Sequence, residues 1–155
     1  MLRTLLAAAT VMITGLLAAT PAVAATGHSP ARGRVFIHRI YYNSPGPDRG
    51  SNSSLNAEWV DLRNSAGHPI TLTSWTLRDA AGHIYRFGQF RLRAHQDVRI
   101  HTGRGSDNGS NLYWGHRWYI WNNDGDTATL RAGTGSLKSR CSYSDPDEQH
   151  ASVTC

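Results

Sequence analysis

The stretch from residue 57 to residue 87, AEWVDLRNSAGHPITLTSWTLRDAAGHIYRF, decides the fold. In its first part Val60 and Leu62 alternate with charged residues, which predicts a strand with these two side chains pointing inward. The same two-residue spacing recurs in Ile70 and Leu72, and in Trp75 and Leu77. Two segments rich in turn-forming residues separate these patterns, Asn64 to Gly67 and Asp79 to Gly82. The stretch therefore predicts short strands joined by tight turns.

The same pattern continues on both sides of this stretch. Residues 34–42 predict a strand with Val35 and Ile37 on one face and Phe36, His38 and Ile40 on the other. Residues 43–56 carry two Pro, two Gly and several Ser and Asn, so we expect a long surface loop without regular structure. Later alternating pairs are Val98 and Ile100, Trp118 and Ile120, and Ala128 and Leu130, and the last candidate strand is Leu137 to Tyr143. No window shows a helical period over three turns, which favours an all-β sandwich or small barrel.

The segment Trp121 to Leu130, WNNDGDTATL, has two interpretations, a cation-binding loop or a tight turn. A calcium loop of the EF-hand type needs alternating Asp residues and a terminal Glu, and the Glu is missing here. Asn, Asp and Gly are also the residues that tight turns demand. We expect a turn over residues 122–125 that closes a hairpin. No metal or other cofactor is expected, with Asp124 and Asp126 as the residues to test for one.

The first 24 residues have the features of a secretory signal peptide, with Arg3, an apolar run and a small-x-small site that predicts cleavage after Ala24. Cleavage leaves 131 of the 155 residues and lowers the formal charge from +5 to +4, because the removed segment carries one Arg and no acid. We expect a secreted, extracellular protein with no stable membrane anchor. Residues 25–33 are expected to form a flexible leader, residues 34–143 one domain, and residues 144–155 a tail.

The chain has two Cys, Cys141 and Cys155. In an exported protein such a pair favours one disulfide. It would pin the polar tail that follows residue 143. Free reactive thiols are the alternative, but no C-x-x-C spacing or nearby His supports them.

Aromatic and basic residues offer two candidate binding surfaces. Aromatic side chains crowd the segment YWGHRWYIW, where alternation cannot bury all of them on one face. Exposed rings could stack on sugars or bases, and buried rings would instead cover one end of the sandwich. The candidate stacking residues are Tyr113, Trp114, Tyr119 and Trp121. Arginines on several strands and loops could bind an anion, and the candidates are Arg99, Arg104 and Arg117.

Catalysis has little support in the sequence. The chain has eight His and many acids, but no G-x-S-x-G and no H-E-x-x-H motif. We therefore expect no catalytic residues. The alternative is a metal-dependent exported hydrolase or nuclease, which would require at least three acids or His to converge on one point. The acids to test are Asp48, Asp61, Asp79, Asp107, Asp124 and Asp126.

The order of these motifs resembles the lamin tail domain of secreted bacterial proteins. The resemblance is carried by NAEWVDLRN, ITLTSWTLRDAAGHIYRF, HTGRG, LYWG and WNNDGDTATLR, and it covers about residues 35–143. It implies an immunoglobulin-like β-sandwich and a recognition module without catalytic residues. The implied role is binding or anchoring. The sequence leaves the partner unknown, and the candidates are cell-wall glycan, extracellular DNA and another secreted protein. The framework positions are Trp59, Val60, Leu62, Asn64, Leu72, Trp75, Leu77, Asp79, Gly125, Asp126 and Leu130.

Overall fold

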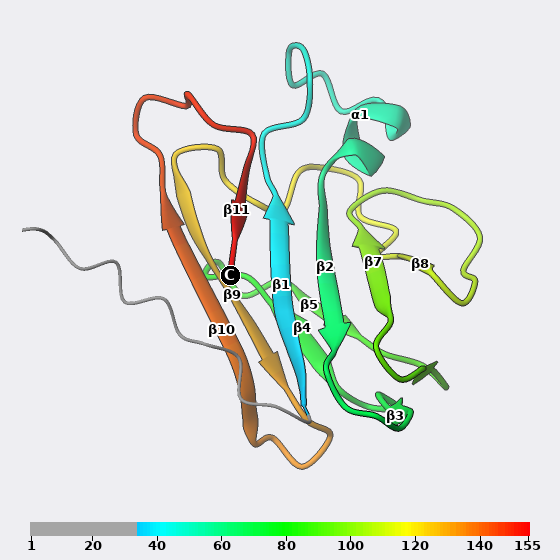
Figure 1. Cartoon of the computed structure of the whole chain (residues 1–155). Coiled ribbons are helices and arrows are strands. Elements are labelled where there is room, and N and C mark those ends of the chain that lie inside the picture. Colours follow the sequence, from blue (N-terminus) through cyan, green and yellow to red (C-terminus); the bar gives the residue numbers. More distant parts are fainter. Residues whose placement is uncertain (1–33) are drawn as a thin grey trace, which may run out of the picture.

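A computed structural model describes residues 34–155, which form two packed β-sheets with one short helix at the edge (Figure 1). The predicted signal peptide (residues 1–24) and leader (residues 25–33) lie outside the described residues. Within residues 34–155, no helix is long and apolar enough to cross a membrane.

The larger sheet, here called the front sheet, has five strands in the order β11-β1-β2-β7-β8. Adjacent strands of this sheet are antiparallel, except that β7 and β8 are parallel. Its strands are β1 (Val35–Tyr41), β2 (Trp59–Asn64), β7 (Asp97–His101), β8 (Asn111–Tyr113) and β11 (Ser152–Thr154).

The second sheet, here called the back sheet, has four antiparallel strands in the order β10-β9-β4-β5. Its strands are β4 (Thr76–Arg78), β5 (Ile84–Arg86), β9 (Gly125–Arg131) and β10 (Leu137–Ser144). A separate two-stranded ribbon pairs β3 (Ile70–Thr71) with β6 (Arg91–Leu92). This arrangement is an immunoglobulin-like β-sandwich, as the sequence predicted.

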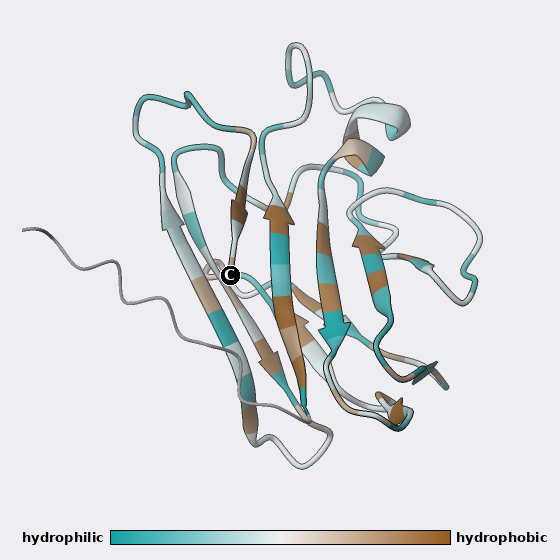
Figure 2. Ribbon diagram, viewed as in Figure 1, coloured by the Kyte–Doolittle hydropathy of each residue, from teal (hydrophilic) through white to brown (hydrophobic). Residues whose placement is uncertain are grey.

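The core lies between the two sheets, where the apolar residues of each strand alternate with polar ones (Figure 2). Val60 and Leu62 from β2 face Leu77, Ala128 and Leu130 of the back sheet, and all five are fully buried. Full burial of a large apolar side chain contributes about 1.5–3 kcal/mol, so these positions supply much of the stability. The predicted inward positions on β2, β4 and β9 are confirmed.

Strand β1 differs from the prediction because its pairing with β2 shifts register between Ile37 and Arg39. This β-bulge changes which side chains face inward. The buried side chains of β1 are Val35, Phe36, Ile37 and Ile40. Strict alternation would instead place Ile37 and Ile40 on opposite faces of the sheet. The predicted two-faced assignment of this strand was therefore wrong beyond residue 37.

Two further segments correct the sequence analysis. The predicted surface loop ends in a helix, α1 (Asn52–Ala57), whose N-cap Ser51 accepts a hydrogen bond from the amide of Ser54. The predicted strand RWYIW is irregular, so the turn at Asn123 and Asp124 closes no hairpin. It instead leads from a long loop into β9, whose partners are β4 and β10.

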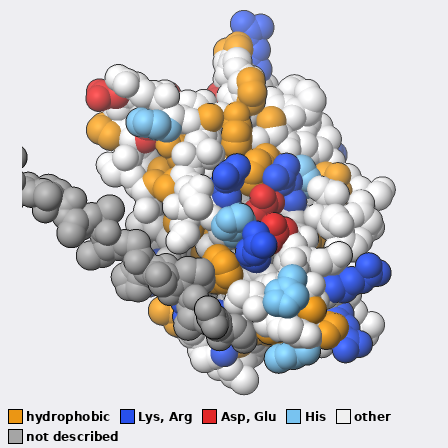
Figure 3. Space-filling model, in the orientation of Figure 1, with side chains coloured by type: hydrophobic (Ala, Val, Ile, Leu, Met, Phe, Trp, Pro, Cys, Tyr) orange, Lys and Arg blue, Asp and Glu red, His pale blue; other side chains and the backbone are white. Residues whose placement is uncertain are grey.

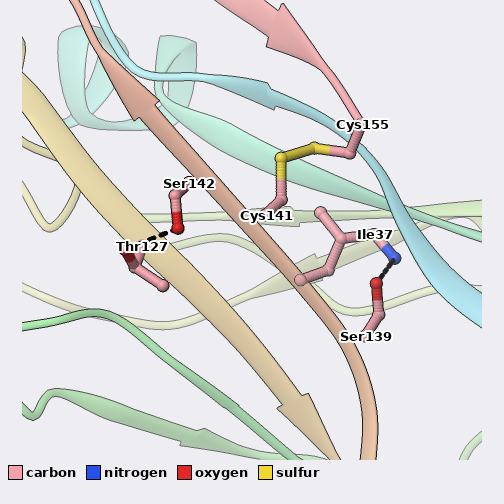
Figure 4. Close-up of a disulfide and its surroundings, with 6 residues drawn as sticks. All are labelled: Ile37, Thr127, Ser139, Cys141, Ser142 and Cys155. Atoms are coloured by element: carbon pink, nitrogen blue, oxygen red, sulfur yellow. Dashed lines mark hydrogen bonds between the residues drawn. A yellow bond between two sulfur atoms is a disulfide. The ribbon is translucent and has the colours of Figure 1, made fainter. Parts of the chain in front are cut away.

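The C-terminal tail ends in a short strand, β11, and the predicted disulfide is present. β11 adds to the edge of the front sheet by pairing with residues 39–41 of β1. The bond between Cys141 and Cys155 links it to β10 of the back sheet, with the two Cα atoms 5.8 Å apart (Figure 4). Beside it, the Ile37 amide donates to the Ser139 hydroxyl at 3.1 Å. These contacts join the two sheets along one side of the sandwich.

Candidate ligand-binding surface

Three loops and helix α1 meet at one end of the sandwich, here called the loop end. Its segments are residues 43–51, α1, residues 102–105 and residues 114–124. The amides of Gly115 and His116 donate to the carbonyls of Gly103 and Thr102 at 2.8 and 2.9 Å. The Asn52 side chain bonds both the amide and the carbonyl of Arg104, at 2.8 and 2.9 Å. Backbone and side-chain bonds thus hold the loops to one another.

Buried Glu58 connects the loop end to the core, a role that the sequence analysis missed. Its Oε1 accepts hydrogen bonds from the Thr102 hydroxyl at 2.6 Å and from the Ile120 amide at 2.8 Å. Its Oε2 has no hydrogen-bond partner among the described residues. Burial raises the pKa of this carboxyl to about 7, although the hydrogen bonds it accepts act to lower it. Glu58 therefore holds the 114–124 loop against β2 and β7.

The four candidate stacking residues do not form one open face. Trp121 is only 1% exposed and packs against Trp114, with ring centroids 6.2 Å apart. Tyr113 stacks on His101 at 4.9 Å, and half-buried Tyr119 bonds the Ser54 hydroxyl through its own hydroxyl at 2.7 Å. The expectation that Trp121 is available for stacking was wrong, because residues 114–124 form no strand and both Ile120 and Trp121 turn into the core.

The exposed ring at the loop end is Trp118, which the alternation pattern had placed inside. Its side chain is 56% exposed, and it lies against Gly50. A Cβ atom at Gly50 would lie 2.7 Å from the Trp118 ring, so only glycine permits this contact. Trp118 is therefore the ring at this end that is best placed to meet a ligand.

Of the three predicted anion-binding arginines, Arg99 is already paired with an acid of the same sheet. Its guanidinium makes two hydrogen bonds to Asp61, at 2.9 and 3.0 Å, and lies 3.4 Å from the centroid of the Trp59 ring. These groups lie on the outer face of the front sheet, where basic and acidic side chains mix (Figure 3). The prediction for Arg99 was wrong because its charge is neutralised within the sheet. Arg104 and Arg117 are exposed at the loop end.

Two of the candidate metal ligands accept hydrogen bonds from backbone amides in or beside turns. Buried Asp126 accepts hydrogen bonds from the Ala80 and Thr127 amides at 2.9 and 2.6 Å, and it thereby ties β9 to the β4–β5 turn. Asp79 accepts from the Gly82 and His83 amides, both at 2.7 Å. Asp124 is exposed. Among residues 34–155, no three His, Cys, Asp or Glu side chains gather in a way that could hold a metal ion.

A shallow cavity of about 380 Å³ opens on another side of the sandwich, beside β5 and β8. Tyr85, Phe90 and Leu112 supply its apolar wall, and Arg91 and Asp107 lie at its margin. Burial raises the pKa of Tyr85 to about 12, and the negative charge of Asp107 adds to the effect. None of the predicted stacking or anion-binding residues lines this cavity, but two of them adjoin it, because Tyr85 packs against Trp114 and Asp107 accepts a hydrogen bond from the Tyr113 amide at 2.9 Å.

Comparison with known proteins identifies the family. The model of the Lamin Tail Domain family matches residues 28–145, which is more than half of the chain. No curated protein matches the chain. The matched range includes every strand of the sandwich except β11, and it contains the motifs in which Asn64, Asp79 and Asp126 hold turns. The chain therefore belongs to the lamin tail domain family.

Proposed function

We propose that this lamin tail domain is exported and acts outside the cell as a binding or anchoring module, without catalysis. The observation that carries the proposal is the Cys141–Cys155 disulfide, which joins the two sheets. Structural disulfides persist in oxidising compartments outside the cytosol. The N-terminal sequence, with its predicted cleavage after Ala24, supports the same location.

A binding role is supported by the organisation of the loop end. Exposed Trp118 lies there, and exposed Arg104 and Arg117 are on neighbouring loops. Loops held by a rigid sandwich are the usual place for recognition residues. The second candidate function, a metal-dependent hydrolase, would use acids such as Asp79 and Asp126, and these carboxylates already accept backbone hydrogen bonds.

Export is tested by expressing the full chain in a secreting host. We expect the protein in the medium, with an N-terminus at Ala25 and a mass that increases by two hydrogen atoms on reduction. A control in which Ala22 and Ala24 of the cleavage site are replaced by bulky residues should retain the signal peptide. A full-length reduced protein that stays inside the cell would contradict the proposal.

Binding is tested by retention on purified cell-wall material and on immobilised DNA across a salt series. Retention that falls with salt indicates contacts with phosphates or other anions, and retention that survives salt indicates stacking. Failure to bind either material, by a protein shown to be folded and oxidised, would count against a binding role for this surface.

A further inference from the structure

Trp118 has the geometry of a stacking platform. The ring is 56% exposed, yet one part of it rests on the backbone of Gly50, which has a positive φ of 69°. Another large exposed apolar side chain, Leu137, lies on β10 of the back sheet opposite Arg131, at the end of β9 that is remote from the loop end. The indole is thus supported on one side and open to solvent on another.

The surroundings of Trp118 hold it in place. Its carbonyl accepts a hydrogen bond from Nδ1 of His116 at 2.8 Å. The ring of Tyr119 stands at 76° to it, with centroids 5.5 Å apart. The Tyr119 hydroxyl accepts from the Gly50 amide at 3.4 Å and bonds Ser54 of α1 at 2.7 Å. Because the platform is fixed before a ligand arrives, binding loses little side-chain entropy.

Three exposed arginines lie on the loops of the loop end. Arg49 precedes Gly50 and Arg117 precedes Trp118, so the two chain segments that meet at this point each bring one arginine. Arg104 comes from a third loop, which Asn52 of α1 holds through two hydrogen bonds. All three arginines are exposed, and none forms an ion pair within residues 34–155. The loop end also carries the exposed acids Asp48 and Asp124, and Asp48 accepts a hydrogen bond from the Asn123 side chain at 3.3 Å.

We propose that the loop end binds single-stranded nucleic acid, with one base stacked on Trp118 and neighbouring phosphates held by Arg49, Arg104 and Arg117. This rests on the proposed binding function and names its ligand. A base can lie on an indole ring only when it is unpaired and unstacked, which selects a single strand. The three unpaired cations favour a ligand with regularly spaced negative charges over a neutral glycan, for which stacking on Trp118 alone would suffice.

Fluorescence anisotropy of a labelled oligothymidylate, with the oxidised mature chain as titrant, tests the base-stacking interaction. Trp118→Ala should weaken binding roughly 5- to 150-fold, the range that corresponds to removing one stacked base. Trp118→Phe should recover part of this affinity because a smaller ring still stacks. Leu137→Ala, at a side chain of similar exposure (51%) on β10, is the matched control and should bind as the parent does.

A salt series on the same complex tests the arginines. Arg49→Gln, Arg104→Gln and Arg117→Gln should each make the dependence of log affinity on log salt shallower, by about 0.7 for each phosphate that is no longer neutralised. Arg140→Gln, which removes an exposed arginine from β10, is the control and should lower the slope less. Thermal melting of every variant establishes that differences in binding do not come from unfolding.

Three outcomes would overturn the proposal. The first is oligothymidylate binding that Trp118→Ala leaves unchanged. The second is a decrease of the salt slope in Arg140→Gln that is as large as the decrease in the three loop-end arginine variants. The third is no binding to oligothymidylate but salt-resistant, Trp118-dependent retention on cell-wall material, which would assign the platform to a sugar ring and leave the proposed binding function standing.

Discussion

Cys141 in β10 is bonded to Cys155, which follows β11, so the disulfide joins the back sheet to the front sheet. The amide of Cys155 also donates to the His38 carbonyl at 2.9 Å, which continues the pairing of β11 with β1. The disulfide therefore links the two sheets along one side of the sandwich, in addition to fixing the C-terminal tail.

Removal of this disulfide should lower stability without changing the fold. The closed loop has a sequence separation of 14, for which the chain-entropy model gives about 3 kcal/mol. We expect Cys141→Ser/Cys155→Ser to lose free energy of unfolding on that order in urea denaturation. Reductant should destabilise the parent to a similar degree and leave the double variant unaffected. Equal stability of the two proteins would contradict the structural role.

The buried Glu58 should make stability depend on pH. Burial raises its folded-state pKa from 4.5 to about 7, so the folded protein holds this proton more tightly than the unfolded chain. Stability from this group is full below about pH 4.5 and falls as pH rises through about 7, by up to about 3 kcal/mol. Glu58→Gln should flatten the decline of the free energy of unfolding between about pH 5 and 8. An unchanged pH profile in this variant would show that Glu58 ionises normally.

Trp121 and Trp118 should differ sharply in their effect on stability. Trp121 is 1% exposed in the core, and truncation of a buried aromatic side chain costs about 3–5 kcal/mol. Trp118 is exposed, so Trp118→Ala should change the free energy of unfolding by about 0.5 kcal/mol or less. Urea unfolding of Trp121→Ala and Trp118→Ala measures both. A large decrease in Trp118→Ala would mean that the ring has a structural role.

Substitutions of Asp126 and of Asp124 should differ in their effect on the free energy of unfolding. Asp126→Ala removes the acceptor for the amides of Ala80 and Thr127, and unsatisfied buried donors cost about 1–3 kcal/mol. Asp124→Ala alters an exposed side chain and should have little effect. We expect neither calcium nor a chelator to shift the melting temperature of the parent. A calcium-induced rise that either substitution abolishes would restore the metal interpretation of WNNDGDTATL.

The fold was predictable where alternation runs through regular strands. Val60, Leu62 and Leu77 each lie on the predicted inward face, because the period of a strand fixes the side to which a side chain points. The same rule misplaced Trp118 and Trp121, because the segment that carries them is irregular and an irregular backbone has no fixed period. It also misplaced Ile40, where one bulge reverses the alternation.

The sequence by itself determined the all-β sandwich, the family and the pairing of the two cysteines. These conclusions rest on alternation, on turn residues, and on a lone cysteine pair in a chain with a predicted signal peptide. Such features can be recognised in the sequence without knowing which residues are neighbours in the folded chain. Only the tertiary structure decided which charged and aromatic groups are free. Arg99 is neutralised by Asp61 from a strand 38 residues away, and Glu58 is buried by a loop 62 residues away. The exposed ring of Trp118 is covered on one part by Gly50, which is distant in sequence. Exposure and charge pairing depend on such long-range interactions. For that reason the sequence named Arg104 and Arg117 as candidates, but only the folded chain showed that Trp118 is the exposed ring beside them.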